Sequence, residues 1–281
     1  MKMLKKFGIG LFVCLMSACG GISDNKQNTR ITAKDSAIMR FAIAGHVYGN
    51  PDTYTLSIYP PFLQQVQKDD QNYSFDYLFL TGDVAAKPTD TNWMNVEKEL
   101  QQLDIPYFIA PGNHDGGDYF LEHIQKSPYC FFSENKNHFI VLNTTNNGWT
   151  TNKQQTDTLQ KVLSTIKDST DKIFVFTHQL WWLKDTPDSF ALDSIRPNSF
   201  AAFDGAENFW KNAFPFFDST GCETWFFAGD VGSHHSLEAY YEDHYGQFHF
   251  YASGMGGGVD DNYLHVALFD DGSVEINKVN F

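Results

Sequence analysis

The fold of this 281-residue chain is decided by residues 106–115, Pro-Tyr-Phe-Ile-Ala-Pro-Gly-Asn-His-Asp. The first half of this stretch is a short apolar run typical of a buried strand. The second half is a turn that carries an amide, an imidazole and a carboxylate. Residues 75–83, Phe-Asp-Tyr-Leu-Phe-Leu-Thr-Gly-Asp, have the same form. Because ligands bind at the carboxyl ends of strands in α/β sheets, both stretches predict a functional site at such an edge.

Three further apolar runs also end in a polar side chain: residues 38–44 before His46, residues 173–177 before His178, and residues 224–228 before Asp230. A single ending of this kind is more often an ordinary turn or a solvated histidine. Five on one chain predict side chains that converge, and the glycines beside several of them allow sharp turns. Histidine, aspartate and asparagine together favour Zn, Mn or Fe over a purely oxygen-bound Mg or Ca.

Apolar runs and amphipathic stretches alternate from residue 38 to the end, which predicts an α/β architecture without internal repeats. Further strands are predicted at residues 139–142, 248–252, 263–269 and 274–279. Helices are predicted at residues 60–68, 93–103, 119–125 and 152–167. Residues 183–220 are predicted to be a long irregular segment with short helices.

The composition excludes several classes of protein. Hydrophobic residues make up 42% of the chain and charged residues 19%, a balance too apolar for a disordered polypeptide. The length is sufficient for one large domain or two small ones. The net charge of −14 argues against a nucleic-acid-binding groove, because such a groove requires a basic face.

Residues 1–18 have the pattern of an export signal, with three lysines, a short apolar run and small residues before Cys19. They are similar to the lipobox of bacterial lipoproteins, which implies cleavage before Cys19 and attachment of lipid to it. An ordinary secretory signal with an incidental cysteine is the alternative. The polar residues 19–36 are predicted to be a flexible tether and residues 37–281 a single domain. Loss of the three lysines leaves 17 basic and 34 acidic residues, a net charge of −17.

The motifs resemble those of the calcineurin-like metallophosphoesterase family. The family pattern is Asp-x-His, Gly-Asp, Gly-Asn-His-(Asp/Glu), an isolated His, and Gly-His-x-His. Asp83 with the glycine before it, residues 112–115 and His178 match this pattern in order and spacing. The resemblance spans residue 38 to the end of the chain, and Gly-Asn-His-Asp after an apolar strand is its most specific part. It implies a four-layer αββα sandwich with metal ions at the strand ends.

The resemblance also implies a role for each matched residue. Asp83, Asn113 and His178 would bind a divalent metal, with Mn, Fe or Zn expected and one or two ions per chain. His114 would stabilise the phosphate and protonate the leaving oxygen. The catalytic set is completed by Asp115, which would steer the His114 ring, and by His46.

Two motifs of the family are altered in this chain. Ala44 replaces the aspartate of Asp-x-His, and residues 229–232, Gly-Asp-Val-Gly, replace Gly-His-x-His. One metal position thereby loses two ligands. The other keeps its three matched ligands and gains Asp230, so we hypothesise a site for a single metal ion. As an alternative, a longer loop would return His234 or His235 to the vacant ligand position.

These residues predict a metal-dependent phosphoesterase that hydrolyses a phosphomonoester or phosphodiester at the cell envelope. We expect a lipid-anchored protein, periplasmic or surface-exposed, that meets the membrane only through its anchor. Its substrate would be a phosphorylated small molecule or glycan, and it would bind no nucleic acid. The retained pair His114 and Asp115 favours catalysis.

Two rival hypotheses come from other classes of protein. The missing carboxylate at Ala44 favours a catalytically impaired phosphoesterase-fold protein that acts as a binding or accessory factor in envelope or glycan metabolism. A structural metal protein of envelope glycan assembly is the third hypothesis.

Four further residues have two interpretations each. Cys130 and Cys222 would form a disulfide in an oxidising compartment or remain two separate buried thiols. Trp181 and Trp182 follow the expected ligand His178 closely. They would stack on a sugar or base of the substrate, or pack in the core.

Overall fold

Two β-sheets packed face to face form the centre of the structure. It is a computed structural model that describes residues 37–50, 52–53, 57–146, 149–166, 168–187, 195–199, 208–233 and 239–281. Within these ranges the first sheet has the strand order β11 (Val274–Asn280), β10 (Asn262–Phe269), β1 (Ala37–Ala44), β2 (Tyr77–Leu80) and β3 (Tyr107–Ile109). The second has the order β4 (Cys130–Glu134), β5 (Asn137–Val141), β6 (Lys172–Phe176), β7 (Glu223–Ala228), β9 (Phe248–Ser253) and β8 (Tyr240–Tyr245).

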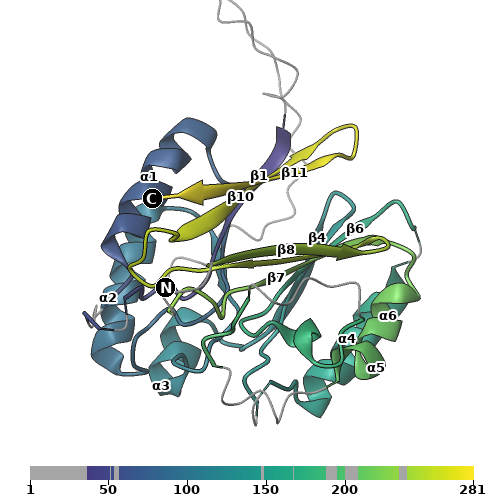
Figure 1. Ribbon diagram of the computed structural model, residues 1–281, viewed down its shortest axis with the longest axis horizontal. Helices are drawn as coiled ribbons and strands as arrows, with labels where there is room; N and C mark the ends of the chain where they lie inside the picture. The colour runs from purple at the N-terminus through teal and green to yellow at the C-terminus, as the bar shows by residue number, and fades with distance from the viewer. Residues whose placement is uncertain are drawn as a thin grey trace, which may run out of the picture.

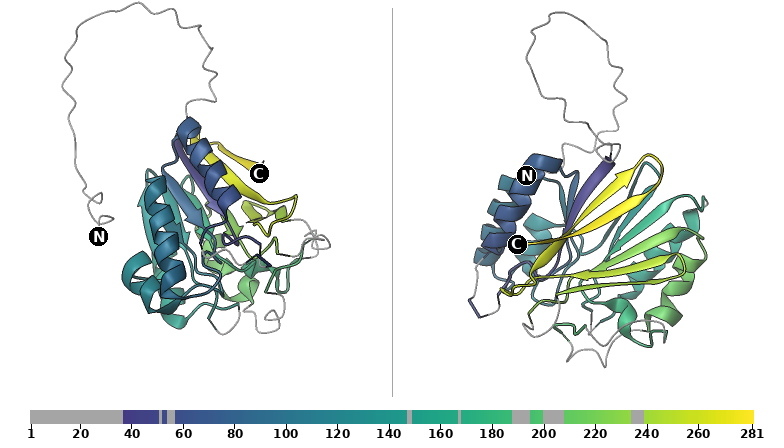
Figure 2. Two further views of the ribbon diagram at one scale, coloured as in Figure 1. Left: turned by 90° about the vertical axis from the view of Figure 1, so that its left-hand side faces the viewer. Right: turned by 45° about the horizontal axis from the view of Figure 1, so that its top comes forward.

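Helices cover the outer face of each sheet (Figure 1). The first sheet is covered by α1 (Pro60–Tyr73) and α2 (Asp90–Leu103), with α3 (Gly117–Tyr119) and the π-helix η3 (Phe120–Ile124) beside α2. The second is covered by α4 (Lys153–Thr165), the 3-10 helix η4 (Trp181–Leu183), α5 (Phe209–Asn212) and α6 (Phe214–Asp218). This order of layers, also visible in Figure 2, confirms the predicted αββα sandwich in a single domain.

Phenylalanine rings fill the space between the two sheets. Phe79 on β2 stacks on Phe176 on β6 with ring centroids 3.8 Å apart and an angle of 4° between the planes. Phe41 on β1 packs edge-on against Phe79 at 5.4 Å and against Phe174 on β6 at 5.5 Å. The aromatic content of 16% therefore serves the sandwich interior, because each buried ring removes a large apolar area from water.

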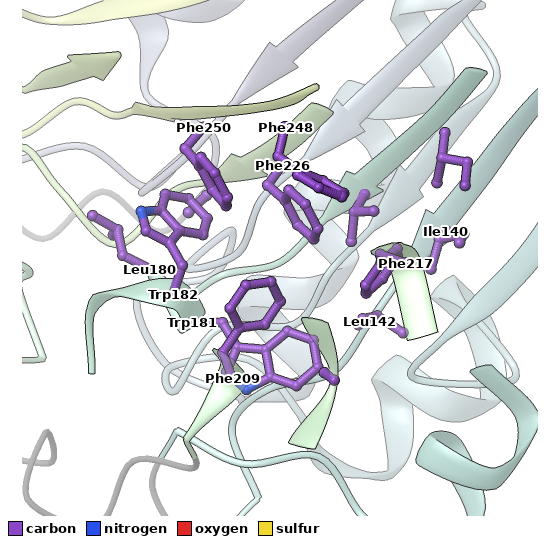
Figure 3. Packing of buried hydrophobic residues seen from close by; sticks show 14 of the residues in the cluster. Ile140, Leu142, Leu180, Trp181, Trp182, Phe209, Phe217, Phe226, Phe248 and Phe250 are labelled. Carbon is purple, nitrogen blue, oxygen red and sulfur yellow. The ribbon is translucent and has the colours of Figure 1, made fainter. Parts of the chain in front are cut away.

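Trp181 and Trp182 pack in the apolar layer between the second sheet and its helices (Figure 3). Their exposed fractions are 1% and 0%. Trp181 lies 5.2 Å from the ring of Phe209, and Trp182 lies 5.2 Å from the ring of Phe250. The expectation that they stack on substrate is therefore wrong, and the core interpretation holds.

Every predicted strand is present, but β4 and β8 are strands that the apolar pattern does not predict. Both lie at the edges of the second sheet, where one side of a strand faces solvent or a charged rim. The sequence of β8, Tyr-Tyr-Glu-Asp-His-Tyr, has no apolar run for that reason. Helix α1 extends past the predicted residues 60–68 to Tyr73, through polar residues of which only Asp69 is buried, where it accepts from the hydroxyl of Tyr263. Within the described residues, the segment after η4 is irregular with short helices, as predicted.

The carboxyl ends of the parallel strands in the two sheets meet at one place. Strands β1, β2 and β3 run parallel to one another, as do β5, β6, β7 and β9. A Cβ atom on Gly229, which follows β7, would collide with the carbonyl group of Thr81, which follows β2. Only glycine permits this approach, which brings the polar strand endings of both sheets together.

The predictions about the cysteines and the N-terminal segment concern residues away from these strand ends. Cys130 is half-buried and Cys222 is buried, and both are free thiols, so they do not form the disulfide considered above. None of the helices in the described ranges is both long and apolar enough to cross a bilayer. The predicted signal peptide, Cys19 and the tether lie within residues 1–36, outside the described residues.

Candidate metal centre

Asp83 lies in the turn after β2, with a backbone φ of 51° and a side chain that is only 2% exposed. Its Oδ1 accepts a hydrogen bond of 3.1 Å from the backbone N–H of His114. A Cβ atom on Gly112 would collide with the same oxygen. Gly112, the first residue of Gly-Asn-His-Asp, therefore leaves the space that the Asp83 carboxylate of the Gly-Asp motif occupies.

His178 follows β6 and is fully buried. Its Nδ1 donates a hydrogen bond of 2.9 Å to the carbonyl of Thr81, because a carbonyl can only accept. This bond turns Nε2 toward three oxygen atoms: Oδ1 of Asp83 at 3.4 Å, Oδ1 of Asp230 at 3.5 Å and Oδ1 of Asn113 at 3.2 Å. Such an orienting bond on the far ring nitrogen is what metal-ligating histidines normally have.

Asp230 follows β7 after Gly229 and is also fully buried. Its backbone N–H donates to the carbonyl of His178 at 3.0 Å, which ties the two strand ends together. Both of its carboxylate oxygens lie 3.2 Å from the backbone nitrogen of Ser199. The Ser199 hydroxyl also donates to Oδ2, so two donors of Ser199 hold this carboxylate.

The donor atoms of this cluster have the spacing of a metal site. Asp83, His178 and Asp230 each offer one ligand atom, and these atoms lie within 4.8 Å of one another. A tetrahedral ion with ligand bonds of about 2.1 Å places its ligands about 3.4 Å apart. The three distances from His178 Nε2 agree with that separation, so these residues and Asn113 fit a first-row divalent ion.

The charges of the cluster also require a cation. Burial alone would lower the pKa of His178, but the carboxylates of Asp83 and Asp230 raise it to about 10. Burial likewise opposes ionisation of Asp83, yet His178 brings its pKa below the ordinary value. Burial raises the pKa of Asp230 to about 6, with Asp83 contributing in the same direction. Two buried carboxylates around one imidazole are compensated either by a proton on His178 or by a metal ion.

His46 lies on the other side of Asp83, in the turn after β1. Its Nδ1 donates to the carbonyl of Met255 at 2.6 Å, which leaves Nε2 as an acceptor 3.9 Å from Oδ2 of Asp83. Burial lowers its pKa to about 4, so the ring is neutral at pH 7. Tyr48 packs against it at 4.4 Å and against the ring of His114 at 5.2 Å. The predicted catalytic residues His46 and His114 are thus linked through a tyrosine that the motifs do not identify.

The His114 ring is half-buried, and its Nδ1 donates to the carbonyl of Ala86 at 3.0 Å. The expectation that Asp115 steers this ring is wrong. The Asp115 carboxylate instead accepts from the backbone N–H groups of Val84, Ala85 and Gly112 at 2.8–3.0 Å. It binds the turn after β2 to the turn after β3, because those turns present backbone donors that need a partner.

His234 and His235, the alternative ligands, lie outside the described residues. Ser199 contacts the cluster, but no signal in its irregular segment identifies it, since its partner lies 31 residues away in the sequence. Two buried polar atoms near these residues, Thr81 Oγ1 and Asn198 Nδ2, lack a hydrogen-bond partner among the described residues.

Two known proteins are similar to this chain. A protein of Arcobacter nitrofigilis, named a probable glycerophosphodiester phosphodiesterase GpdQ, is 27% identical over 67 residues, which is 24% of this chain and 24% of that protein. The chain thus matches about a quarter of the length of this curated relative. The crystal structure of a dimetal phosphatase from Danio rerio superposes with a TM-score of 0.59 at 12% identity, covering 87% of this chain and 99% of that one. This second likeness concerns the fold.

A family model extends the match to most of the chain. The model described as calcineurin-like phosphoesterase matches residues 52–251, a span that contains Asp83, Asn113, His178 and Asp230. The sandwich and the cluster at its strand ends agree with that match. The chain therefore belongs to the calcineurin-like phosphoesterase family, whose members are hydrolases that act on phosphate esters.

Proposed function

We propose that the protein hydrolyses a phosphomonoester or phosphodiester with a single divalent metal ion, at the cell envelope. The observation that carries this proposal is the position of His178 Nε2, 3.2–3.5 Å from oxygen atoms of Asp83, Asn113 and Asp230. Four donors of this kind suffice to hold one ion, and an ion that expands to five ligands keeps a position for a phosphoryl oxygen. The substrate class we propose is a phosphorylated small molecule or glycan.

The ion would be held by Asp83, Asn113, His178 and Asp230, with Mn, Fe or Zn favoured by the mixed nitrogen and oxygen donors. Two carboxylates balance the charge of one divalent ion, so a second ion is not needed for neutrality. When bound, such an ion supplies Lewis acidity toward a phosphoryl oxygen. It also answers the objection that a chain of net charge −14 repels phosphate, because the ion neutralises the two carboxylates at the site.

The protein's own residues supply orientation and proton transfer. His114 Nδ1 is fixed by Ala86, so Nε2 is the nitrogen left to face the leaving oxygen, to which the doubly protonated ring would donate its Nε2 proton. The ring is partly open to solvent and therefore to a substrate. Asp115 holds the two turns together through three backbone N–H groups, which keeps His114 and Asp83 at a fixed separation. Neutral His46 keeps its unprotonated Nε2 3.9 Å from Asp83 Oδ2, and because both atoms are acceptors no hydrogen bond joins them.

The activity is tested with the full-length protein, freed of metal and then supplied with Mn, Zn, Fe or Ca. We expect one ion per chain by elemental analysis and turnover of nitrophenyl phosphate mono- or diesters. Asp83→Asn and His114→Ala should each abolish turnover while the melting temperature stays close to that of the wild type. His123→Ala, on the exposed face of η3, is the matched control and should leave turnover unchanged.

Two outcomes would contradict the proposal. Turnover that persists in both Asp83→Asn and His114→Ala would place the activity elsewhere. Two ions per chain, with Asp83 bridging them, would exclude the single-metal site. Ala44, at the position of a lost family carboxylate, favours the second candidate function, a binding or accessory protein; metal binding without turnover of any ester would support that candidate.

The envelope location is a separate part of the proposal and rests on residues 1–18 and Cys19. We expect incorporation of a palmitate analogue into the wild type in a bacterial host and membrane association of the product. Cys19→Ser should abolish both. Release of an unlabelled wild-type protein into the soluble fraction would favour the ordinary secretory signal instead.

A further inference from the structure

Asp230 is held in place by a segment that lies far from it in the sequence. The Ser199 hydroxyl donates to Oδ2 of Asp230, and its backbone N–H lies 3.2 Å from both carboxylate oxygens. The neighbouring Asn198 donates its backbone N–H to the Asp230 carbonyl at 2.8 Å and accepts from the Ser233 N–H at 3.0 Å. Residues 195–199 are thus fastened to the end of β7 by several hydrogen bonds that all converge on Asp230 and its neighbours.

A buried tryptophan determines the direction of the Ser199 hydroxyl. The indole Nε1–H of Trp149, which is 1% exposed, donates to Ser199 Oγ at 3.0 Å. An indole nitrogen can only donate, so the hydroxyl oxygen must accept at this position. The single hydroxyl proton is then available only for Asp230, and the chain of hydrogen bonds runs in one direction from Trp149 through Ser199 to Oδ2.

We propose that Trp149 and Ser199 are positioning residues that present Asp230 to the metal through one oxygen. The Ser199 hydroxyl bonds Oδ2, and its backbone N–H lies equally close to both oxygens. Oδ1, 3.5 Å from His178 Nε2, is therefore the oxygen without a hydroxyl partner and the one that faces the other ligands. The same donors stabilise a carboxylate that has no access to water. This inference rests on the proposed function, because it concerns the ligand set of that metal site.

The donors match the residue that they hold. Asp230 stands where the motif of the family has a histidine, and a histidine ligand carries an N–H on its second ring nitrogen. That N–H needs an acceptor, as the pairing of His178 with the Thr81 carbonyl illustrates. Ser199 instead directs two donors, its backbone N–H and its hydroxyl, at position 230, while its oxygen accepts from Trp149. The hydrogen-bond chain therefore suits a carboxylate at position 230 and not an imidazole.

The first test measures metal affinity directly, by calorimetric titration of the metal-free full-length protein with Mn or Zn. We expect Ser199→Ala to weaken binding about 10- to 100-fold, the range typical for partners of metal ligands. Ser199→Thr keeps the hydroxyl and should stay within about threefold of the wild type. Trp149→Phe removes the orienting donor and should fall between the two. Ser164→Ala, on the exposed face of α4, is the matched control and should bind like the wild type.

The second test does not depend on metal. The indole ¹H–¹⁵N signal of Trp149 in the metal-free protein, identified by its loss in Trp149→Phe, should shift upfield and exchange faster with solvent in Ser199→Ala. Ser199→Thr should restore it. This signal reports the hydrogen bond from Trp149 to Ser199 itself, whereas a merely structural serine would change the melting temperature and leave metal affinity as it is.

Each outcome decides the inference. Equal metal affinity in Ser199→Ala and the wild type would overturn it, as would an indole signal that does not move. A wild type that binds no metal at all would overturn it as well, since there would be no ion to which Asp230 is presented. A wild type that binds metal but hydrolyses no ester would refute the proposed function, while the Ser199 affinities would still support the positioning role.

Discussion

His178 and Asp230 follow adjacent parallel strands, and their Nε2 and Oδ1 atoms lie 3.5 Å apart with neither side chain exposed to solvent. A proton or a metal ion must lie between groups of this kind, because a buried carboxylate without a positive partner is strongly disfavoured. The pKa of His178 is raised to about 10 by Asp83 and Asp230 against the effect of burial. In the metal-free protein the proton therefore stays on His178 at pH 7.

Metal binding is expected to release this proton. A ligand histidine must be neutral, so close to one proton per ion should leave between pH 7 and 9. The apparent metal affinity should rise about tenfold per pH unit up to about pH 10. Calorimetry in HEPES and Tris, which differ in ionisation enthalpy, measures the released proton. No release at pH 8 would contradict a protonated His178.

The same shift predicts how the stability of the metal-free protein depends on pH. The folded-state pKa of His178 lies above its unfolded value of about 6.5. Its stabilising contribution is therefore complete below pH 6.5 and is lost as the pH rises toward 10. Chemical denaturation of the metal-free protein at pH 7 and pH 9.5 should show this loss. His178→Ala should show a smaller difference between the two pH values.

A glycine beside Asp83 offers a test of the geometry. Gly112→Ala places a Cβ atom against both Oδ1 and the backbone nitrogen of Asp83, so the carboxylate and the turn that carries it must shift from their positions beside His178. We expect metal affinity to fall at least about tenfold, as for other disturbances of metal-ligand orientation. Metal titration of the purified variant measures the fall.

The control for this change is Gly246→Ala in the turn between β8 and β9. A Cβ atom there meets nothing within 4 Å, but the backbone φ is 60°. It should cost about 1 kcal/mol of stability through backbone strain and leave metal affinity unchanged. Equal metal affinity in Gly112→Ala and Gly246→Ala would show that Asp83 does not need its present position.

Four of the five strands that carry the site could be predicted from the sequence because they are buried on both faces. β1, β2, β6 and β7 lie inside their sheets, and so appear as uninterrupted apolar runs that end in polar residues. The fifth, β3, is an edge strand of the first sheet, but Tyr107 and Ile109 are buried, so it too appears as an apolar run. Edge strands β4 and β8 face the rim of the second sheet and carry mixed sequences. Periodicity alone does not distinguish such strands from loops.

The metal ligands could be predicted for the same reason, but the groups that hydrogen-bond to the residues of the site could not. Asp83, Asn113, His178 and Asp230 follow strands whose ends had to meet. The Ser199 hydroxyl and the carbonyls of Ala86 and Met255 act on side chains far away in the sequence. Any serine or backbone carbonyl has the same chemical capacity, so no local pattern marks these residues. For Asp115 the motif itself misled. It implied a contact with the His114 ring, but the Asp115 carboxylate accepts from backbone N–H groups instead.

Trp182 provides a test of the core assignment. It is fully buried against Phe226 and Phe250, so Trp182→Ala should cost about 3–5 kcal/mol of unfolding free energy. Trp182→Phe fills much of the same space and should cost less. Neither variant, where folded, should change KM by more than about twofold, because the indole does not reach the surface. A large rise in KM for Trp182→Phe with an unchanged melting temperature would restore the substrate-stacking interpretation.

The two cysteines are expected to behave as independent, unreactive thiols. Burial raises the pKa of Cys130 to about 12, and burial also raises the pKa of Cys222. Because the thiolate is the nucleophile, iodoacetamide at pH 8 should modify the native protein only slowly. Denaturation without a reducing agent should expose both thiols to rapid alkylation, and mass spectrometry of the digested protein then identifies each site. A peptide pair linked through the two sulfur atoms, in protein purified from the periplasm, would show that these strands approach more closely than the structure has them.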